Sequence, residues 1–332
     1  MKKTSLYFVL IFFATFMYST AQESGTEPVA ETQAEVTSEF DLLIQYLEEN
    51  GNFINSEKTP ALISPDEIKK NFKNEKYLVL DIRSESWFEY GHIKNAKNVK
   101  AADLLTYFEN DIDPASLDKI VLICYSGQSA SYFAGLLRLA GYDNVYSMKW
   151  GMSSWRQDFA ENSWLKNIKN DFAENLETTD HAKPEKGTFP VLKTGKTDAK
   201  EILRVRLDSL FAEPYKEFIV KSADVFETPS NYFVAHYGPQ DVYAAGHIPG
   251  AINYTPKSLT LETLATLPVD KKIALYDSTG LGTAYALAYL NVLGYDAGNI
   301  AYGMNAFMNE TLKDNKWDAF TNKDVNMFPV IE

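Results

Sequence analysis

The sequence has little cysteine and little histidine: Cys124 is the single cysteine in 332 residues, and there are four histidines. One thiol cannot form an intramolecular disulfide, which excludes a disulfide-stabilised scaffold. The histidines lack the spacing of metal ligands, so no metal site and no cofactor is expected; they are His92, His181, His236 and His247. Composition alone leaves open whether the thiol is buried and inert or exposed and reactive.

Positive charge is also scarce, with 32 Lys and Arg against 45 Asp and Glu and a formal net charge of −13. No basic cluster offsets this balance, so nucleic acid is not an expected partner. After the N-terminal segment the sequence has no apolar run of the roughly 20 residues that a membrane-spanning helix needs.

The first 21 residues have the layout of a secretory signal peptide. Lys2 and Lys3 precede an apolar run, and small residues lead up to Ala21, so cleavage is expected before Gln22. An uncleaved anchor is the alternative, although the run is short for a spanning helix. Cleavage would leave 30 basic against 45 acidic residues, a net charge of −15. The expected location is outside the cytoplasm, which is the periplasm if the source is a Gram-negative bacterium, with no stable membrane insertion.

Three blocks of the sequence occur twice. "GHIKNAKNV" matches "GHIPGAINY", "KIVLICYSGQSASYFAGLLRLAGYD" matches "KIALYDSTGLGTAYALAYLNVLGYD", and "WGMSSW" matches "YGMNAF". The offsets between matched glycines are 246 − 91 = 155, 294 − 141 = 153 and 303 − 151 = 152. A period this long predicts a duplicated domain rather than a solenoid of short repeats.

Short apolar runs of strand length alternate with stretches of helical spacing, as in "KYLVLDIR", "AADLLTYFEN", "KIVLIC" and "SASYFAGLLRLAG". This pattern predicts α/β domains, each with a central parallel sheet that has helices on both faces. The predicted domains are 59–166 and 214–332, joined by a polar linker, 167–213, in which "ILRVRLDSLF" is a candidate helix.

The tail that precedes the first domain, residues 22–58, begins with a polar stretch without apolar period, which is expected to be flexible. A short amphipathic helix follows in "SEFDLLIQYLEENG", with Ser38 as the expected cap. Its predicted buried stripe consists of Phe40, Leu43, Ile44 and Leu47.

Cys124 lies at the carboxyl end of a predicted central strand, which is the edge where open α/β sheets build their sites. The loop 125–130 leads directly into a helix, so its N–H groups and the helix N-terminus can point at the sulfur and favour a thiolate. Gly127 supplies the tight turn. Side chains that can donate further hydrogen bonds follow in the same loop, namely Ser126, Gln128 and Ser129.

The segments "LDIRSESWFEYGHIKNA", "ICYSGQSAS" and "LAGYDNVYSMKWGMSSW" together resemble the rhodanese family of sulfurtransferases. The resemblance implies that Cys124 is a nucleophile that accepts sulfane sulfur and becomes a persulfide. It implies small sulfur-containing substrates, with a protein sulfur donor or acceptor as a further possibility. It also implies support of the site by Asp81 and Arg83, and a substrate-binding loop of Tyr125, Ser126, Gly127, Gln128, Ser129 and Ala130.

Two differences between this loop and the loops of related proteins limit the substrates that are expected. Phosphatases of the cell-division type resemble this family but have a loop one residue longer with an arginine that grips phosphate, and no arginine lies between Cys124 and Ala130. Phosphate chemistry is therefore not expected. Many rhodaneses also carry Arg or Lys in the loop to attract thiosulfate, and this loop carries neither. A polysulfide, a persulfidated small thiol or a protein donor fits as well as thiosulfate.

In the second copy Asp277 stands where the first has Cys124, and His236 and Gly238 stand where the first has Asp81 and Arg83. Because a carboxylate cannot carry sulfane sulfur, this copy is predicted to be inactive and to bury surface against the first. The alternative is that its shape persists as a pocket. An anion is not expected there, since Asp277 would be ionised and solvated by loop N–H groups.

We also predict the surroundings of several other residues. We expect His92 and His247 to be hydrogen-bonded structural residues, His181 to be solvated in the linker, Trp150 and Trp155 to lie in a core or interface, and Trp87 and Tyr125 to lie near the site. The rival to an enzyme is a non-catalytic binding module, or a sulfur carrier or sensor that acts with a protein partner.

Overall fold

A computed structural model describes residues 37–332; the predicted signal peptide and the polar stretch after it lie outside these residues. Within them, no helix has the length and apolar character needed to cross a membrane. The first of two sheets is wholly parallel, with the strand order β1-β5-β4-β2-β3. Its strands are β1 Leu62–Ile63, β2 Tyr77–Asp81, β3 Lys97–Asn98, β4 Lys119–Ile123 and β5 Val145–Met148.

The second sheet repeats the first, with the parallel order β6-β10-β9-β7-β8. Its strands are β6 Ile219–Val220, β7 Tyr232–His236, β8 Ile252–Asn253, β9 Lys272–Tyr276 and β10 Ala297–Ile300. The register is also repeated, because Asp81 lies opposite Ile123 in the first sheet and His236 lies opposite Tyr276 in the second. The prediction of two tandem parallel α/β domains is confirmed.

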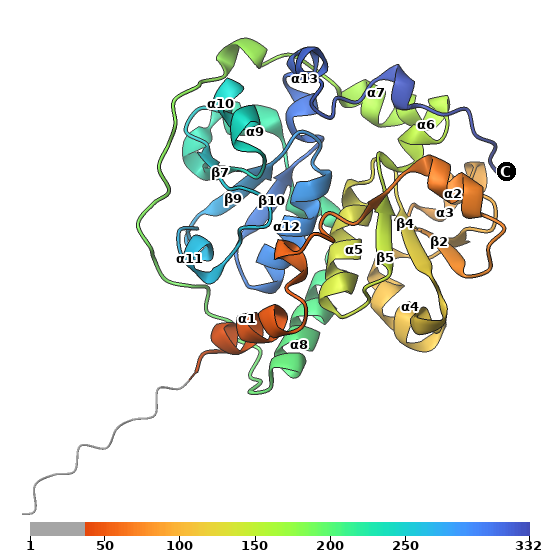
Figure 1. The fold of residues 1–332 in the computed structure, drawn as a ribbon, viewed down its shortest axis with the longest axis horizontal. Coiled ribbons are helices and arrows are strands. Elements are labelled where there is room, and N and C mark those ends of the chain that lie inside the picture. Colours follow the sequence, from red (N-terminus) through yellow and green to blue (C-terminus); the bar gives the residue numbers. More distant parts are fainter. Residues whose placement is uncertain (1–36) are drawn as a thin grey trace, which may run out of the picture. The chain divides into compact units, whose positions relative to one another are not determined.

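Helices cover both faces of each sheet (Figure 1). On the first sheet, α4 and α5 pack on one face and α2 and α6 on the other; on the second, α11 and α12 oppose α9, α10 and α13. Their bounds are α2 Pro65–Asn71, α3 Glu85–Tyr90, α4 Leu104–Asn110, α5 Gln128–Leu139, α6 Gln157–Asn162, α7 Trp164–Asn167, α9 Ser222–Glu227, α10 Gln240–Ala245, α11 Leu261–Leu264, α12 Leu281–Val292 and α13 Asn309–Asn315.

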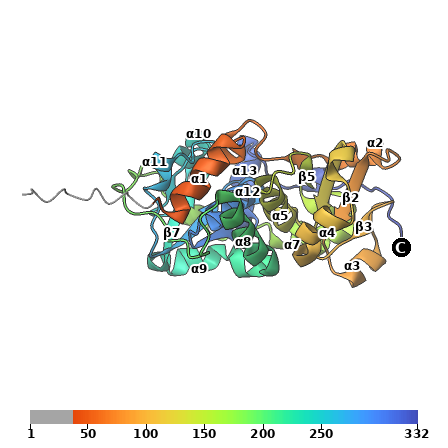
Figure 2. The same ribbon diagram turned by 90° about the horizontal axis from the view of Figure 1, so that it is seen from below.

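The two copies share one core, in which α5 and α12 pack directly against each other (Figures 1 and 2). Gly135 makes the close approach possible, because a Cβ there would lie 2.9 Å from the Cβ of Ala288. A buried hydroxyl chain crosses the same contact: the Tyr285 hydroxyl lies 2.9 Å from Ser147 Oγ and donates to the Ala61 carbonyl. The inner face of each sheet is thus covered by helices of its own copy, and these helices pack against those of the other copy.

Two helices outside the sheets confirm local predictions. Helix α1, Glu39–Glu49, begins at Ser38 with a capping box and buries the predicted stripe of Phe40, Leu43, Ile44 and Leu47. Helix α8, Ala199–Ala212, contains the predicted "ILRVRLDSLF" segment and starts at Asp198, whose carboxylate accepts two backbone N–H groups. The two helices pack together beside the shared core (Figure 1).

Each copy receives a strand-like bridge from the segment that follows the other copy. Glu177, in the segment after the first copy, forms an antiparallel bridge with His247 of the second. Ile331, at the end of the chain, forms the equivalent bridge with His92 of the first. The bridged histidines belong to the repeated Gly-His-Ile motif, so the exchange follows the internal symmetry of the fold.

Candidate active site at Cys124

Cys124 directly follows β4, the central strand of the first sheet, and α5 begins four residues later. Gly127 turns the chain with a φ of +90°, which favours glycine. The Cys124 sulfur accepts the backbone N–H groups of Gly127 at 3.1 Å and Ala130 at 3.4 Å. These donors can stabilise negative charge on the sulfur. The cysteine is 2% exposed.

The repeated Gly-Met element packs against the backbone of this loop. Gly151 has a φ of +58°, and a Cβ there would lie 2.5 Å from the Gly127 nitrogen and 2.6 Å from the Cys124 carbonyl oxygen. The next residue, Met152, donates its N–H to that carbonyl at 2.9 Å. Gly303 and Met304 make the same contacts with Asp277. The sequence revealed this element as a repeat, but its supporting role was missed.

A cavity of about 460 Å³ lies beside the Cys124 loop. Four of the predicted substrate-binding residues line it, namely Tyr125, Ser126, Gln128 and Ser129. Trp87 also lines it and meets the Tyr125 ring edge-on at 5.8 Å, as its place near the site predicted. Sequence reasoning missed the residues of the second copy that complete the wall, which are Tyr215, Lys216, Ile219, Ala301 and Tyr302.

Two of these missed residues bring polar chemistry to the cavity. Lys216 is the residue of its lining that carries a positive charge. The Tyr215 hydroxyl accepts a hydrogen bond from Asn299 Nδ2 at 2.9 Å, which leaves its own proton free to donate. Burial raises the pKa of the Tyr215 hydroxyl, so that proton is retained. Both residues belong to the 3₁₀-helix η6, Tyr215–Phe218, some ninety positions after the loop, and no local pattern could have found them.

The polar side chains of the loop form hydrogen bonds with neighbouring residues. Gln128 Oε1 accepts the N–H of Tyr302 at 2.9 Å, and Gln128 Nε2 donates to Ser126 Oγ at 3.3 Å. Trp164 Nε1 donates to the Ser126 carbonyl at 2.9 Å. The side chains of Ser126 and Gln128 therefore brace the loop, and the hydrogen bonds to the sulfur come from the backbone.

Asp81 and Arg83 form a buried ion pair beside the site, 1% and 2% exposed. Arg83 Nη2 lies 2.7 Å from Asp81 Oδ2 and also donates to the Gly91 carbonyl. Arg83 Nη1 has no hydrogen-bond partner within residues 37–332. The guanidinium lies 5.0 Å from the Phe159 ring and 6.0 Å from the Tyr125 ring, so it stands behind the aromatic wall of the cavity.

In the second copy the Asp277 carboxylate occupies the equivalent cradle. It accepts N–H groups from Gly280 and from Thr283 at 3.0 Å, which follow it at the same distances along the chain as Gly127 and Ala130 follow Cys124. Thr279 adds a third N–H at 2.7 Å. Burial nevertheless raises the pKa of the Asp277 carboxyl, while these hydrogen bonds act in the opposite direction. The prediction of a well-solvated carboxylate considered the hydrogen bonds alone and omitted burial.

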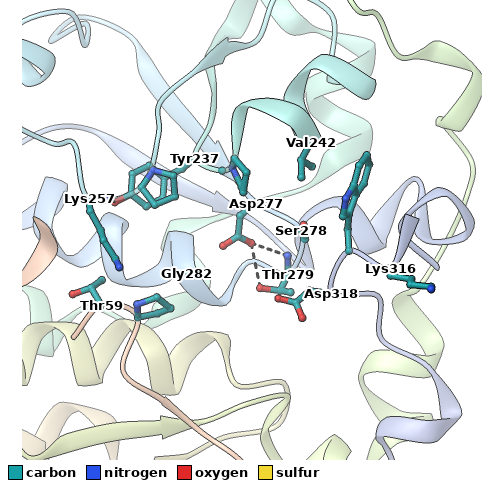
Figure 3. A pocket seen from close by; sticks show the side chains of 15 residues that line it. Thr59, Tyr237, Val242, Lys257, Asp277, Ser278, Thr279, Gly282, Lys316 and Asp318 are labelled. Atoms are coloured by element: carbon teal, nitrogen blue, oxygen red, sulfur yellow. Dashed lines mark hydrogen bonds between the residues drawn. The ribbon is translucent and has the colours of Figure 1, made fainter. Parts of the chain in front are cut away.

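A second cavity, of about 400 Å³, opens above Asp277 (Figure 3). Lys257 and Lys316 line it together with Asp277 and Asp318, so both signs of charge are present. Lys257 is paired with Glu57, outside the lining. A pocket is therefore present in the second copy, as the alternative interpretation of this copy requires. The loop that follows its central strand has no cysteine.

In the second copy, both residues of the buried Asp81–Arg83 ion pair are replaced. His236 Nδ1 lies 2.8 Å from Asn253 Oδ1, and burial lowers the pKa of His236 to about 4. A Cβ on Gly238 would lie 2.6 Å from His236 Cε1. A side chain at position 238 would crowd the imidazole, so His236 and Gly238 fit together where the first copy has Asp81 and Arg83.

The surroundings of the remaining histidines can be compared with those predicted for them. His92 and His247 are hydrogen-bonded as predicted, with Nδ1 3.0 Å and 2.8 Å from the carbonyls of Phe88 and Tyr243. His181 is partly buried rather than fully solvated, with a side chain that is 34% exposed and an Nε2 that lies 2.7 Å from Glu177 Oε1. The tertiary structure also brings Glu177, His181 and His247 close together, which their spacing in the sequence did not indicate.

The fold and the loop define a tandem α/β protein with a thiol at the carboxyl end of a central strand. The Rhodanese-like domain family matches residues 64–158 and 236–310, and the chain belongs to this family. The thiosulfate sulfurtransferase GlpE of Shewanella oneidensis is 35% identical over 80 residues, which are 24% of this chain and 75% of that protein.

Two further comparisons are more distant. A tRNA uridine(34) hydroxylase of Listeria monocytogenes is 28% identical over 114 residues, 33% of this chain and 34% of that protein. The crystal structure of SseA from Escherichia coli, in the class of 3-mercaptopyruvate sulfotransferases, is 17% identical, with a TM-score of 0.27, over 73% of this chain and 98% of that one.

Proposed function

We propose that this protein is a sulfurtransferase that moves sulfane sulfur through a persulfide on Cys124. The observation that carries the proposal is the position of the sulfur, which accepts two backbone N–H groups at the end of a central strand, beside a cavity. The similarity of the first copy to thiosulfate sulfurtransferases supports a sulfurtransferase activity in general. Asp277 in the second cradle assigns the chemistry to the first copy.

The proposed reaction has two steps through a covalent intermediate. The Cys124 thiolate attacks the outer sulfur of thiosulfate; the sulfur–sulfur bond of the donor breaks, and sulfite leaves with the electron pair. An acceptor such as cyanide then attacks the terminal sulfur of the persulfide. Thiocyanate forms, the enzyme's sulfur–sulfur bond breaks, and the thiolate returns. The N–H groups of Gly127 and Ala130 stabilise the anion that both steps pass through.

The enclosure of the thiol favours a small donor. Cys124 is 2% exposed, and the cavity beside its loop has Trp87 and Tyr125 in its wall. A thiosulfate or a short polysulfide is of a size to enter the cavity, whereas a protein donor would have to displace this wall. Lys216 of the second copy, which is 76% exposed and lies 3.8 Å from Glu217, brings a positive charge to the wall of the cavity. The signal peptide predicted at residues 1–21 would place the activity outside the cytoplasm.

Intact mass spectrometry tests the proposal directly. Incubation of the full chain with thiosulfate or polysulfide is expected to add the mass of one sulfur atom, which cyanide removes. Cys124→Ala should gain no mass with either donor. Failure of every donor to load Cys124 would refute the assignment. Loading without multiple turnovers in the presence of cyanide or sulfite would favour the rival, a sulfur carrier or sensor that needs a protein partner.

Lys216→Ala is expected to raise the KM for thiosulfate roughly two- to fivefold and leave kcat unchanged, because an exposed cation acts on the approach of an anion and loses its effect at high salt. Lys200→Ala on α8, which removes the same charge away from the cavity, is the matched control and should leave KM unchanged. Steady-state assays at low and high salt measure the difference. Equal KM values for both variants would mean that Lys216 does not act on the donor.

A further inference from the structure

A cluster of metal-ligating side chains lies in the second copy, away from both cavities. Glu177 and His181 come from the segment after the first copy, and His247 comes from the Gly-His-Ile motif of the second. One ligand atom of each residue lies within 4.8 Å of the others. The antiparallel bridge between Glu177 and His247 fixes the two segments in register, so the backbone itself brings the ligands together.

The buried histidine is prepared as a ligand. His247 is 0% exposed, and its Nδ1 lies 2.8 Å from the Tyr243 carbonyl, which can only accept, so Nδ1 carries the proton. Its Nε2 therefore offers a lone pair, and this atom has no hydrogen-bond partner within residues 37–332. It points at Glu177 Oε1, 3.7 Å away. A histidine whose far nitrogen donates to a carbonyl is the arrangement that orients metal-bound imidazoles.

The distances suit a small divalent ion. Ligand atoms on a tetrahedral zinc ion lie about 3.3 Å apart, given zinc bonds of about 2.0–2.1 Å. Two of the three separations lie on either side of this value, because Glu177 Oε1 lies 2.7 Å from His181 Nε2 and 3.7 Å from His247 Nε2, and all three atoms lie within 4.8 Å of one another. The side chains of His181 and Glu177 are 34% and 27% exposed, which leaves an entry path and room for water as a fourth ligand.

We propose that Glu177, His181 and His247 form a binding site for a divalent transition-metal ion of the zinc class. Two imidazoles and one carboxylate are a ligand set that zinc accepts, with water in the fourth position. The bound ion would hold the exchanged segment on the second copy.

The first copy provides an internal comparison. There the bridge partner of the equivalent histidine, His92, is Ile331, which offers no ligand atom from its side chain. The His92 ring still stacks on a neighbouring aromatic ring, as the His247 ring does, so the motif itself does not require a metal. The ligands are therefore an addition specific to the second copy.

Calorimetric titration of the full chain with Zn²⁺ tests the proposal, after treatment with a chelator and in a Cys124→Ser background that removes the thiol as a competing ligand. We expect one ion per chain. Glu177→Gln and His181→Gln should each weaken binding at least about tenfold, since even residues that only orient a ligand change metal affinity by that much. Both side chains are partly exposed, so these variants are expected to fold, which circular dichroism checks.

The matched control is Glu174→Gln, which removes the same charge from an exposed position on the same segment. It should bind Zn²⁺ like the parent protein. No binding by the parent up to about millimolar Zn²⁺ would overturn the proposal, as would equal binding by the parent and both ligand variants. Absorption of the Co²⁺-loaded protein gives a second readout: intense visible bands of a four- or five-coordinate ion are expected in the parent and should vanish in His181→Gln.

Discussion

Cys124→Ala is expected to lose thiosulfate–cyanide turnover by at least about 10³-fold, because covalent catalysis has no substitute once the nucleophile is gone. The loss should appear in kcat rather than KM, since the cavity walls and Lys216 remain. Stability should change little, because one buried sulfur atom is removed beside an existing cavity. Steady-state assays together with thermal unfolding measure both quantities.

The second copy provides the matched control for this substitution. Asp277→Asn changes the equivalent position and keeps one oxygen, which can still accept the N–H groups of Thr279 and Gly280, while the Thr283 N–H loses the second carboxylate oxygen as its acceptor. Turnover should stay within about twofold of the wild type, since mutations at sites that do not touch the reaction leave the barrier unchanged. Residual multiple-turnover activity in Cys124→Ala, or a large loss of turnover in Asp277→Asn, would contradict the assignment of the reaction to the first copy.

Asp81→Ala is expected to lower the free energy of unfolding by about 3–5 kcal/mol, because it leaves the buried Arg83 guanidinium without a counter-charge. The pair is 1% and 2% exposed, so solvent cannot replace the carboxylate. Urea unfolding followed by tryptophan fluorescence measures the change. A loss below about 1 kcal/mol, the size of a surface ion pair, would show that the pair is not buried in solution.

The repeat itself supplies the control for this second variant. The double substitution Asp81→His/Arg83→Gly copies the second copy, where His236 bonds to Asn253 and Gly238 makes room for the ring. Asn98 already stands where Asn253 does in the repeat. Because no unpaired charge remains, the double variant should be more stable than Asp81→Ala. An equal or greater loss would mean that the cost does not arise from an unpaired arginine.

The sequence by itself determined much of this protein. Alternating strand and helix patterns with a long internal period predicted two parallel α/β domains, because secondary-structure periodicity and turn glycines are encoded locally. The position of Cys124 was also readable, since a thiol, a glycine turn and a helix start follow one another within a few residues. Comparison of the two copies located Asp277 in the second cradle without any coordinates.

Only the tertiary structure decided the features that depend on distant segments meeting. Lys216 and Tyr215 reach the Cys124 cavity because α5 and α12 pack together and place the start of the second copy beside the loop of the first. Burial, which raises the pKa of Asp277, is a property of the assembled loop and not of its sequence. His181 and His247 are 66 positions apart in the chain. They become neighbours because each copy exchanges its terminal segment with the other, a long-range pairing that no local spacing records.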